Sequence, residues 1–391
     1  TAPISTPTRA GLMTGRYPNR FGIRTTVIPP WREDGLDENE ETLADMLARN
    51  GYSNRAIIGK WHLGHTRKVH YPINRGFSHF YGHLNGAIDY FDHMREGELD
   101  WHNDWETCYD KGYSTELITQ EAVRCINTYE KEGPFLLYVA YNAPHTPLQA
   151  QEKDIELYCD DFGSLTPKEQ KRVTYQAMVS CMDRGIGTIV DALKKKGIMD
   201  NTFLIFFSDN GPAGVPGSSS GKLRGRKFDE WDGGVRVPAV FYWKRAESNY
   251  KNLSSQVTGF VDIVPTLKEL VGDKNRPERA YDGISILPLL IGSTSCIDRN
   301  FYLGCGAVVN KDYKLIRKGR KPGLNLPQDF LVDYQTDPYE KKNASNGNEQ
   351  IVRSLYQVAL KYDTITPCLP EIPYGKGREG FKAPVEWKVT R

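Results

Sequence analysis

The sequence predicts an α/β fold in which helices sandwich a mostly parallel sheet, followed by a smaller C-terminal subdomain built on a short antiparallel sheet. Three observations support this prediction. Apolar runs typical of strands buried on both faces occur at residues 135–140 and 202–207. Segments with a helical spacing of apolar residues alternate with these runs, as they do when helices cover a parallel sheet. After about residue 295, the long helical segments give way to short strand candidates.

The first half of the chain alternates helical and strand-like segments. The segment Glu41–Asn50 carries Thr42, Leu43, Met46 and Leu47 on one helical face, and the strand-like Arg55–Ile58 follows it. The same reasoning predicts, in chain order, a helix over about 114–131, a strand over Phe135–Ala140, a helix over about 167–196 and a strand over Thr202–Phe207.

The last quarter of the chain has a different pattern. Short strand candidates lie at Tyr302–Leu303, Tyr313–Ile316 and Phe330–Tyr334, and a helix is predicted near residues 348–361. We therefore expect a main domain over residues 1–295 and an α+β subdomain with a tail over residues 296–391.

Composition excludes several classes of function. The chain has 391 residues with 51 Lys and Arg against 49 Asp and Glu, so it offers no large cationic field for nucleic acid. No apolar run approaches the ~20 residues that span a bilayer. The seven cysteines have no metal-type spacing, and their odd number leaves at least one thiol unpaired within the chain. We expect a globular protein without nucleic-acid partners or membrane spans.

Polar residues follow three of the predicted strands, at the point where each strand ends. Lys60 and His62 follow the strand at residues 55–58, His145 follows the strand at 135–140, and Asp209-Asn210 follow the strand at 202–207. Ligands and catalytic groups gather at the carboxyl ends of parallel strands, so we expect one site there. The carboxylate and amide oxygens of Asp209 and Asn210 suit Ca²⁺ or Mg²⁺. In an extended segment, Lys60 and His62 point to one side.

Each of these residues also has an ordinary structural interpretation. Asp-Asn-Gly is a common turn, Lys60 alone would be a solvated charge, and a lone histidine is commonly a partner of a backbone carbonyl. The segment Ser5–Arg16 can likewise be a turn that opens a helix, with Thr8 as its N-cap and Gly15 as its terminator.

The order of the motifs favours the functional interpretation. Residues Ser5–Arg16, Ser-Thr-Pro-Thr-Arg-Ala-Gly-Leu-Met-Thr-Gly-Arg, match every fixed position of the signature of type I sulfatases. Further segments resemble that family in the right order, namely Gly59–Gly64, Pro144–Pro147, Ser208–Gly211, Leu223–Pro238 and Asp333–Glu340. The resemblance extends from residue 1 to about residue 340 and implies an alkaline-phosphatase-like fold.

The resemblance also implies a mechanism. In the family, the residue that matches Ser5 is oxidised by a maturase to formylglycine, an aldehyde whose hydrate is the nucleophile. Arg9, Lys60 and Lys227 would bind the sulfate, His62 would abstract a proton and His145 would protonate the leaving group. Asp209, Asn210 and the formylglycine oxygen at Ser5 would hold Ca²⁺, or Mg²⁺ in its place.

One departure from the family concerns the start of the chain. Sulfatases begin with a strand that ends in an Asp-Asp pair of metal ligands, and here the motif already begins at Ser5, so the main domain lacks that first strand. We expect a segment upstream of Thr1 to supply it, because a nucleophile at a fraying terminus would be poorly held.

The substrate is predicted from a more local likeness. Residues 75–93 and the Arg226-Lys227 block look most like arylsulfatase B, the N-acetylgalactosamine-4-sulfatase, which implies a sulfated glycan with a galacto-configured 4-sulfate. The candidate sugar contacts are His65, Asp89, His93, Trp101 and His102. Two alternatives stay open: a formylglycine-dependent phosphodiesterase or phosphonate hydrolase, and an inactive sugar-binding relative. The family implies a periplasmic, secreted or, in a eukaryote, lysosomal protein; the sequence indicates no oligomeric state.

Overall fold

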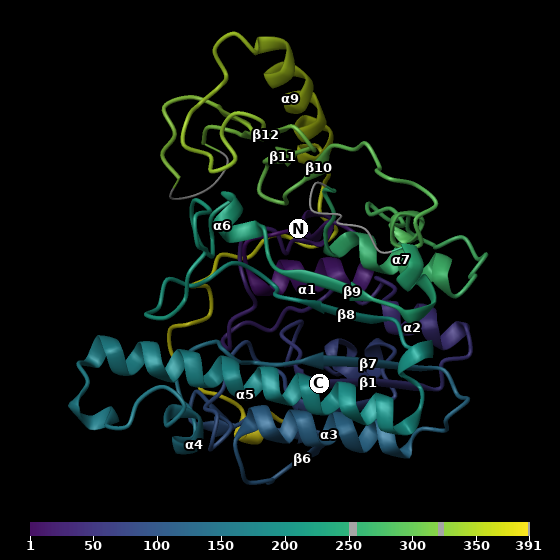
Figure 1. The fold of residues 1–391 in the computed structure, drawn as a ribbon, viewed down its shortest axis with the longest axis vertical. Helices are drawn as coiled ribbons and strands as arrows, with labels where there is room; N and C mark the ends of the chain where they lie inside the picture. Colours follow the sequence, from purple (N-terminus) through teal and green to yellow (C-terminus); the bar gives the residue numbers. More distant parts are fainter. Residues whose placement is uncertain (250–255, 320–323, 390–391) are drawn as a thin grey trace. The chain divides into compact units, whose positions relative to one another are not determined.

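The computed structural model of the chain describes residues 1–249, 256–319 and 324–389. They form two compact units (Figure 1). Unit 1 comprises Thr1–Val27, Phe203–Gly214 and Ser219–Ile372, and unit 2 comprises Ile28–Thr202, Val215–Ser218 and Pro373–Arg391. Unit 1 contains residues from both sides of position 295, where the sequence predicts a domain boundary; that boundary stays a prediction.

Unit 2 is built on a mixed sheet with the strand order β6-β5-β2-β1-β7. Its strands are β1 (Asn54–Lys60), β2 (His79–His83), β5 (His102–Asn103), β6 (Glu106–Thr107) and β7 (Phe135–Ala140), and a separate hairpin pairs β3 (Met94–Arg95) with β4 (Glu98–Leu99). β1 pairs in parallel with both β2 and β7, whereas β5 and β6 add an antiparallel edge. The parallel centre confirms the predicted α/β class.

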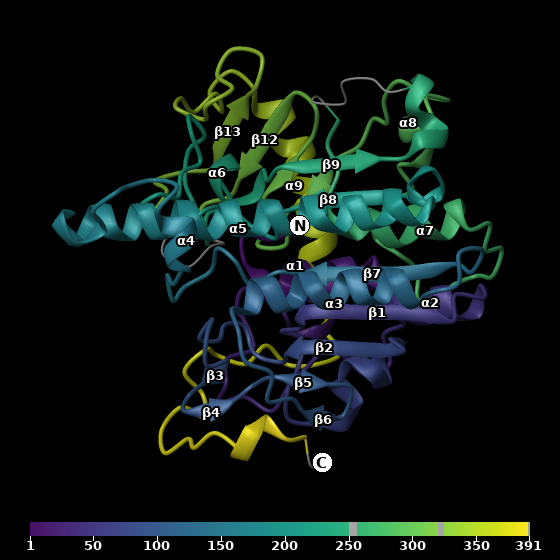
Figure 2. The same cartoon turned by 60° about the horizontal axis from the view of Figure 1, so that its bottom comes forward.

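Helices of unit 2 begin where the sequence provides caps. They are α2 (Leu43–Arg49), α3 (Ser114–Thr128), α4 (Glu152–Ile155) and α5 (Pro167–Lys196). Thr42 and Thr166 form capping boxes at the starts of α2 and α5, which explains why both helices start near the predicted positions. Figure 2 shows α3 lying along β1 and β7, and α5 packs against α3.

Unit 1 contains two antiparallel sheets. The first pairs β8 (Leu204–Phe207) with β9 (Ala239–Tyr242), and the second has the order β10-β11-β12-β13. Its other elements are α1 (Ser5–Thr14), α6 (Asp232–Val235), α7 (Ile263–Leu270), α8 (Leu287–Leu290), β10 (Phe301–Tyr302), β11 (Val308–Val309), β12 (Tyr313–Ile316), β13 (Phe330–Asp333) and α9 (Glu349–Asp363). The small sheet and α9 share one apolar core, which confirms the predicted C-terminal α+β substructure.

Two expectations about the apolar strands are wrong. β7 and β8 were expected to be buried on both faces, but their side chains are only half-buried, apart from the buried Ala140. β7 is an edge strand of its sheet, and β8 pairs only with β9 within the described residues, so neither strand has neighbours on both sides. An apolar run predicts a strand, but it does not specify which strands lie on either side of that strand.

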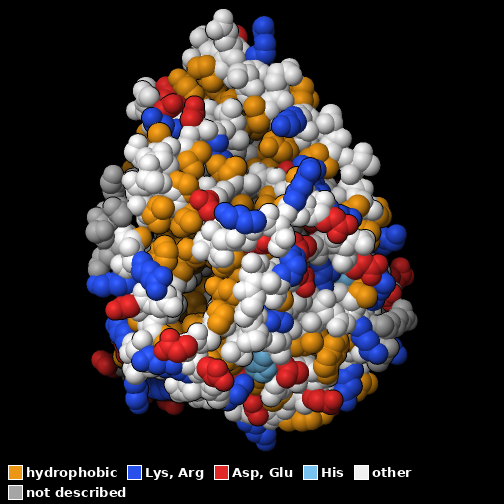
Figure 3. Space-filling view, turned by 90° about the vertical axis from the view of Figure 1, so that its right-hand side faces the viewer, with side chains coloured by type: hydrophobic (Ala, Val, Ile, Leu, Met, Phe, Trp, Pro, Cys, Tyr) orange, Lys and Arg blue, Asp and Glu red, His pale blue; other side chains and the backbone are white. Residues whose placement is uncertain are grey.

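The surface and the cysteines agree with the sequence. On the face drawn in Figure 3, acidic and basic side chains are interspersed without a broad area of one sign. Within the described residues, none of the helices combines the length and apolar character that crossing a bilayer requires. Cys108, Cys125, Cys159, Cys181 and Cys296 are free thiols.

Candidate active site

In unit 1, Ser5 is the first residue of α1. Its hydroxyl accepts a hydrogen bond from Nε of Arg9 at 3.0 Å, one helical turn further along, and both residues are buried. α1 starts at Ser5, so the alternative with Thr8 as N-cap is wrong: the Thr8 hydroxyl instead donates to the carbonyl of Ala2. Gly15 does end the helix, in the left-handed conformation with φ 68°. The N-terminal end of a helix favours negative charge.

Asp209 and Asn210 follow β8, as the sequence predicts. Oδ2 of Asp209 lies 3.6 Å from Nη2 of Arg9, so the guanidinium contacts both the Ser5 hydroxyl and this carboxylate. The side chain of Asn210 donates to the carbonyl of Gly211 at 2.9 Å. Its Oδ1 is buried and accepts no hydrogen bond from the described residues. A buried oxygen without a donor, next to a carboxylate, fits a ligand of a hard cation.

Lys227 lies on the loop that precedes α6. Its amide donates to the carbonyl of Pro212 at 2.9 Å, which fixes this loop beside the turn at Asp209. Burial lowers the pKa of Lys227, Asp209 raises it and Arg9 lowers it, with a net lowering. The structure thus brings Ser5, Arg9, Asp209 and Lys227 together in unit 1.

A close backbone contact between two glycine segments holds these loops together. The amide of Gly211 donates to the carbonyl of Gly234 at 2.9 Å. A Cβ on Gly211 would lie 1.9 Å from the carbonyl oxygen of Gly233, so the contact excludes any side chain.

In unit 2, Lys60 and His62 lie at the end of β1, where the sequence places them. Both are buried. The strand ends at Lys60, and His62 has a left-handed φ of 62°, so the prediction that strand alternation orients both side chains is wrong. The amide of His62 donates to the carbonyl of Leu84 at 3.0 Å. A Cβ on Gly86 would lie 2.4 Å from Cε1 of His62, so the imidazole ring packs directly on Gly86.

Asp100 is a residue of this region that sequence reasoning missed. It is fully buried and accepts hydrogen bonds from the amides of Leu84 and Asn85, from the Asn85 side chain and from His102. Asp100 therefore fixes the loop whose Leu84 carbonyl binds the His62 amide. A single aspartate two residues before a histidine gave no recognisable signal.

His145 follows β7 on a loop between two prolines. Its amide donates to the carbonyl of Asn142, and its carbonyl accepts from the Tyr90 hydroxyl at 2.8 Å. Nδ1 lies 2.8 Å from the carbonyl oxygen of Thr146, which can only accept, so Nδ1 carries a hydrogen. The ring is therefore oriented by a backbone partner, as general acids and bases are.

The five candidate sugar contacts lie in unit 2 and have protein partners. Nε2 of His65 donates to the carbonyl of Pro30, His93 stacks on Trp101 with ring centroids 4.5 Å apart, and His102 binds Asp100. These four residues are at most 2 % exposed, which favours a packing role. Asp89 is half-buried and caps a turn by accepting from the amides of Phe91 and Asp92. Sugar contact stays a prediction for all five.

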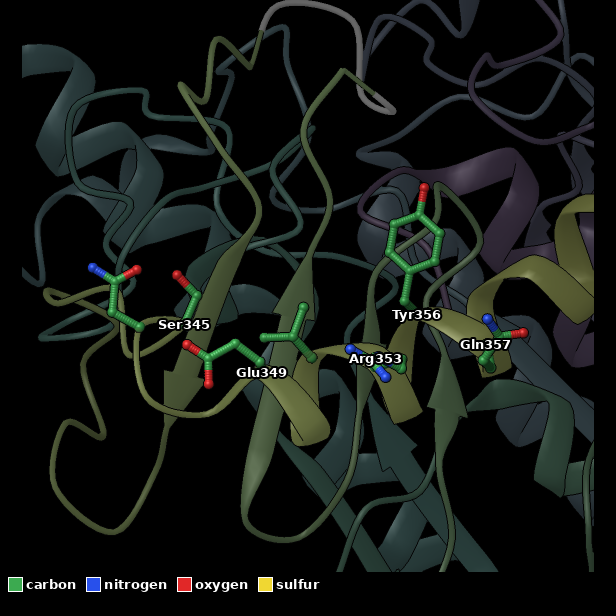
Figure 4. A pocket seen from close by; sticks show the side chains of 7 residues that line it. Ser345, Glu349, Arg353, Tyr356 and Gln357 are labelled. Atoms are coloured by element: carbon green, nitrogen blue, oxygen red, sulfur yellow. The ribbon is translucent and has the colours of Figure 1, made fainter.

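A pocket in unit 1 is lined by other residues. It runs along α9 and is lined by Ser345, Asn346, Glu349, Val352, Arg353, Tyr356 and Gln357 (Figure 4). None of the predicted site residues lines it, so we do not place the active site there.

Comparisons with known proteins agree with the motifs. A family model described as "Sulfatase" matches residues 1–273. Arylsulfatase J of Mus musculus is 35% identical over 294 residues, which cover 73% of this chain and 48% of the relative. N-acetylgalactosamine-6-sulfatase of Mus musculus is 31% identical over 313 residues, which cover 74% of this chain and 57% of the relative. The chain therefore spans about half the length of the curated relatives it matches.

Solved structures extend the similarity to most of the chain. The crystal structure of Ps i-CgsB in complex with k-i-k-neocarrahexaose matches with a TM-score of 0.82 and 29% identity. The match covers 95% of this chain and 85% of that one.

Proposed function

Because the chain belongs to the sulfatase family, we propose that it hydrolyses the sulfate esters of a sulfated glycan, with Ser5 as the nucleophile position. The observation that carries this proposal is the group around Ser5. The Ser5 hydroxyl lies at the start of a helix, 3.0 Å from Nε of Arg9. The same unit brings Asp209 and Lys227 to the Arg9 guanidinium.

The charges in this group suit a sulfate ester. Negative charge spreads over the transferring oxygens in the transition state, and cations placed beside those oxygens are the largest expected contribution to catalysis. The fork of Arg9 binds two oxygens of an oxyanion, and Lys227 adds a second positive charge. We assign Lys60 the same role from its match to the family motif.

A divalent metal and formylglycine complete the proposed site. Asp209 and the buried, unpaired Oδ1 of Asn210 would supply two of the six to eight oxygens that Ca²⁺ takes. When bound, Ca²⁺ would stabilise negative charge on the sulfate oxygens. Formylglycine at Ser5, formed by a maturase, would supply a hydrated aldehyde as the nucleophile.

Two histidines are assigned to proton transfer. His62, held through Leu84 and Gly86, would take a proton from the nucleophile position. His145, with Nδ1 bound to the Thr146 carbonyl, would hold the proton for the leaving oxygen on Nε2.

The test begins with the modification of Ser5. Mass spectrometry of the peptide that contains Ser5, from protein co-expressed with a serine-type maturase, should show the loss of two hydrogen atoms. The same preparation should hydrolyse an aryl sulfate much faster than an aryl phosphodiester. An active enzyme with unmodified Ser5 would contradict the assigned nucleophile, and a preference for the phosphodiester would favour the alternative reaction.

The position of the sulfate is the finer part of the proposal. We favour a galacto-configured 4-sulfate, on the likeness of residues 75–93 to 4-sulfatases, although N-acetylgalactosamine-6-sulfatases are among the similar relatives. Initial rates on 4-sulfated and 6-sulfated galactosides separate the two, and a strong preference for the 6-sulfate would overturn the choice. From the family alone we propose a periplasmic or secreted location, or a lysosomal one in a eukaryote.

A further inference from the structure

A second group of metal-ligand side chains lies in unit 2, where α3 packs on the start of β2. Among the described residues, His79, Glu121 and Cys125 are the one group of three His, Cys or carboxylate residues whose ligand atoms all lie within 4.8 Å of one another. Glu121 and Cys125 are one helical turn apart, and His79 begins β2. The cysteine is buried and the other two are half-buried. None of these residues belongs to the proposed sulfatase site.

The ligand types and their partners suit Zn²⁺. One nitrogen, one oxygen and one sulfur with a fourth position open to water is a donor set that zinc accepts. Nε2 of His79 faces Oε1 of Glu121 at 2.6 Å, while its Nδ1 lies 2.8 Å from Oδ1 of Asp104. A carboxylate on the second ring nitrogen is the usual partner of a zinc-bound histidine. Cys125 Sγ lies 3.9 Å from Oε1 of Glu121.

A cation already lies among these three side chains. Nη2 of Arg124 is 2.5 Å from Oε1 of Glu121, 3.5 Å from Nε2 of His79 and 3.9 Å from Sγ of Cys125. The Arg124 side chain is 54% exposed, so it can leave without breaking the core. Its Nε also donates to Oε2 of Glu121 at 2.7 Å, a bond that can persist while Oε1 binds a metal.

We propose that His79, Glu121 and Cys125 bind a Zn²⁺ ion at the point that the Arg124 guanidinium occupies in this structure. A tetrahedral ion needs its ligand atoms about 3.4–3.7 Å apart, so the 2.6 Å contact between His79 and Glu121 opens by about 1 Å. The ion would join α3 to β2 and stabilise unit 2.

The test uses untagged, metal-free protein and Co²⁺ as a spectroscopic probe. A thiolate-to-metal charge-transfer band should appear with one Co²⁺ per chain and disappear when Zn²⁺ displaces it. Cys125→Ser should lose the band, whereas the control Cys159→Ser should keep it. Absence of the band in the wild type, or its persistence in Cys125→Ser, would overturn the proposal.

Two further variants test the geometry even if Cys125→Ser does not fold. Glu121→Gln should keep the band but weaken Zn²⁺ binding about 10- to 100-fold, because a charged ligand is lost. Arg124→Gln should tighten Zn²⁺ binding about tenfold, because the competing cation is gone. An unchanged or weaker affinity in Arg124→Gln would contradict the assigned position of the ion.

Discussion

At the scale of single residues, the group around Ser5 combines a helix terminus with two cations and one carboxylate. Arg9 contacts both the Ser5 hydroxyl and Asp209. These two contacts restrain the orientation of the Arg9 guanidinium, which would otherwise rotate freely. Lys227 approaches from a different loop, and burial lowers its pKa. Because burial strengthens electrostatic interactions, each cation contributes more here than it would in water.

Replacement of Lys227 by Ala should lower kcat/KM by about 10²–10³ while the fold stays intact, because it removes a charge that serves the transition state. Steady-state kinetics on an aryl sulfate measure the effect, and circular dichroism checks the fold. The matched control is Lys222→Ala, an exposed lysine on the same loop. If the Lys227→Ala enzyme were as active as this control, Lys227 would be an ordinary solvated surface lysine without a catalytic role.

Asp100 makes the acid stability of the protein testable. Burial alone would raise the pKa of Asp100, but the hydrogen bond from His102, the positive field of His83 and the amide of Leu84 hold it well below its usual range. The charged form therefore stabilises the folded state above the unfolded pKa of about 4, and this stability is lost as the pH falls through the folded pKa.

Asp100→Asn should consequently lower the melting temperature strongly at pH 7 and less strongly near pH 2, because part of the charge-dependent stability is lost between the unfolded and the folded pKa. At neutral pH, breaking this buried charged network should cost about 3–5 kcal/mol. Thermal melts of both proteins across this range measure the difference. An equal loss of stability at both pH values would mean that the carboxylate charge plays no part.

At the scale of elements, the ends of β1 and β2 position the catalytic candidates through glycines. β1 and β2 approach so closely that a Cβ on Gly82 would lie 2.2 Å from the carbonyl oxygen of Gly59. Beyond β2, Gly86 supports the ring of His62. His62 has a left-handed backbone, so its side chain does not follow the alternation of side chains along β1. This backbone conformation depends on the support from Gly86.

Gly86→Ala should therefore lower kcat at least tenfold, because its Cβ would lie 2.4 Å from Cε1 of His62 and displace the ring. The control is Gly187→Ala in α5, where a Cβ meets nothing within 4 Å. That change should leave kcat unchanged and stabilise the helix by about 0.5–1 kcal/mol. Equal kcat values for the two variants would contradict a positioning role for Gly86.

A buried ion network ties α6 to the small sheet within unit 1. Nζ of Lys314, on β12, lies 2.7 Å from Oδ1 of Asp232 and 2.8 Å from Oε1 of Glu340, and it has no exposed surface. The hydroxyl of Tyr334 also donates to Asp232 at 2.9 Å. Asp232 is followed by the two glycines that contact Gly211, so the network supports the loops of the candidate site.

Lys314→Met should destabilise the protein by about 3–5 kcal/mol, because it removes the cation that both buried carboxylates contact and leaves Asp232 only the ion pair with Arg236 at 3.5 Å. Chemical denaturation measures the loss, and Lys311→Ala, an exposed lysine close to β12, should be neutral. Comparable stability of the two variants would contradict the importance of the buried network.

At the scale of the whole molecule, local signals in the sequence predicted which helices and strands form better than they predicted which elements lie next to one another. Pro167 after a capping threonine fixed the start of α5, and the apolar run 135–140 coincided with β7. The edge position of β7 and the pairing of β8 with β9 depend on residues distant in sequence, which no local pattern specifies. The motifs predict Ser5, Arg9 and Asp209 as site residues, whereas Asp100 and Lys314 act through tertiary contacts and carry no motif.

The proposed calcium site gives a prediction for the whole molecule. Removing divalent metal with a chelator should abolish activity and lower the melting temperature, and Ca²⁺ should restore both. A ligand at 100 times its Kd stabilises the folded state by about 2.7 kcal/mol.

Asp209→Ala should lose this response to Ca²⁺, whereas the exposed control Asp200→Ala should keep it. Cys125→Ser should also keep it, because a thiolate does not suit Ca²⁺. If Asp209→Ala retained the full shift with Ca²⁺, the ion would bind elsewhere, and the assignment of Asp209 and Asn210 would fail.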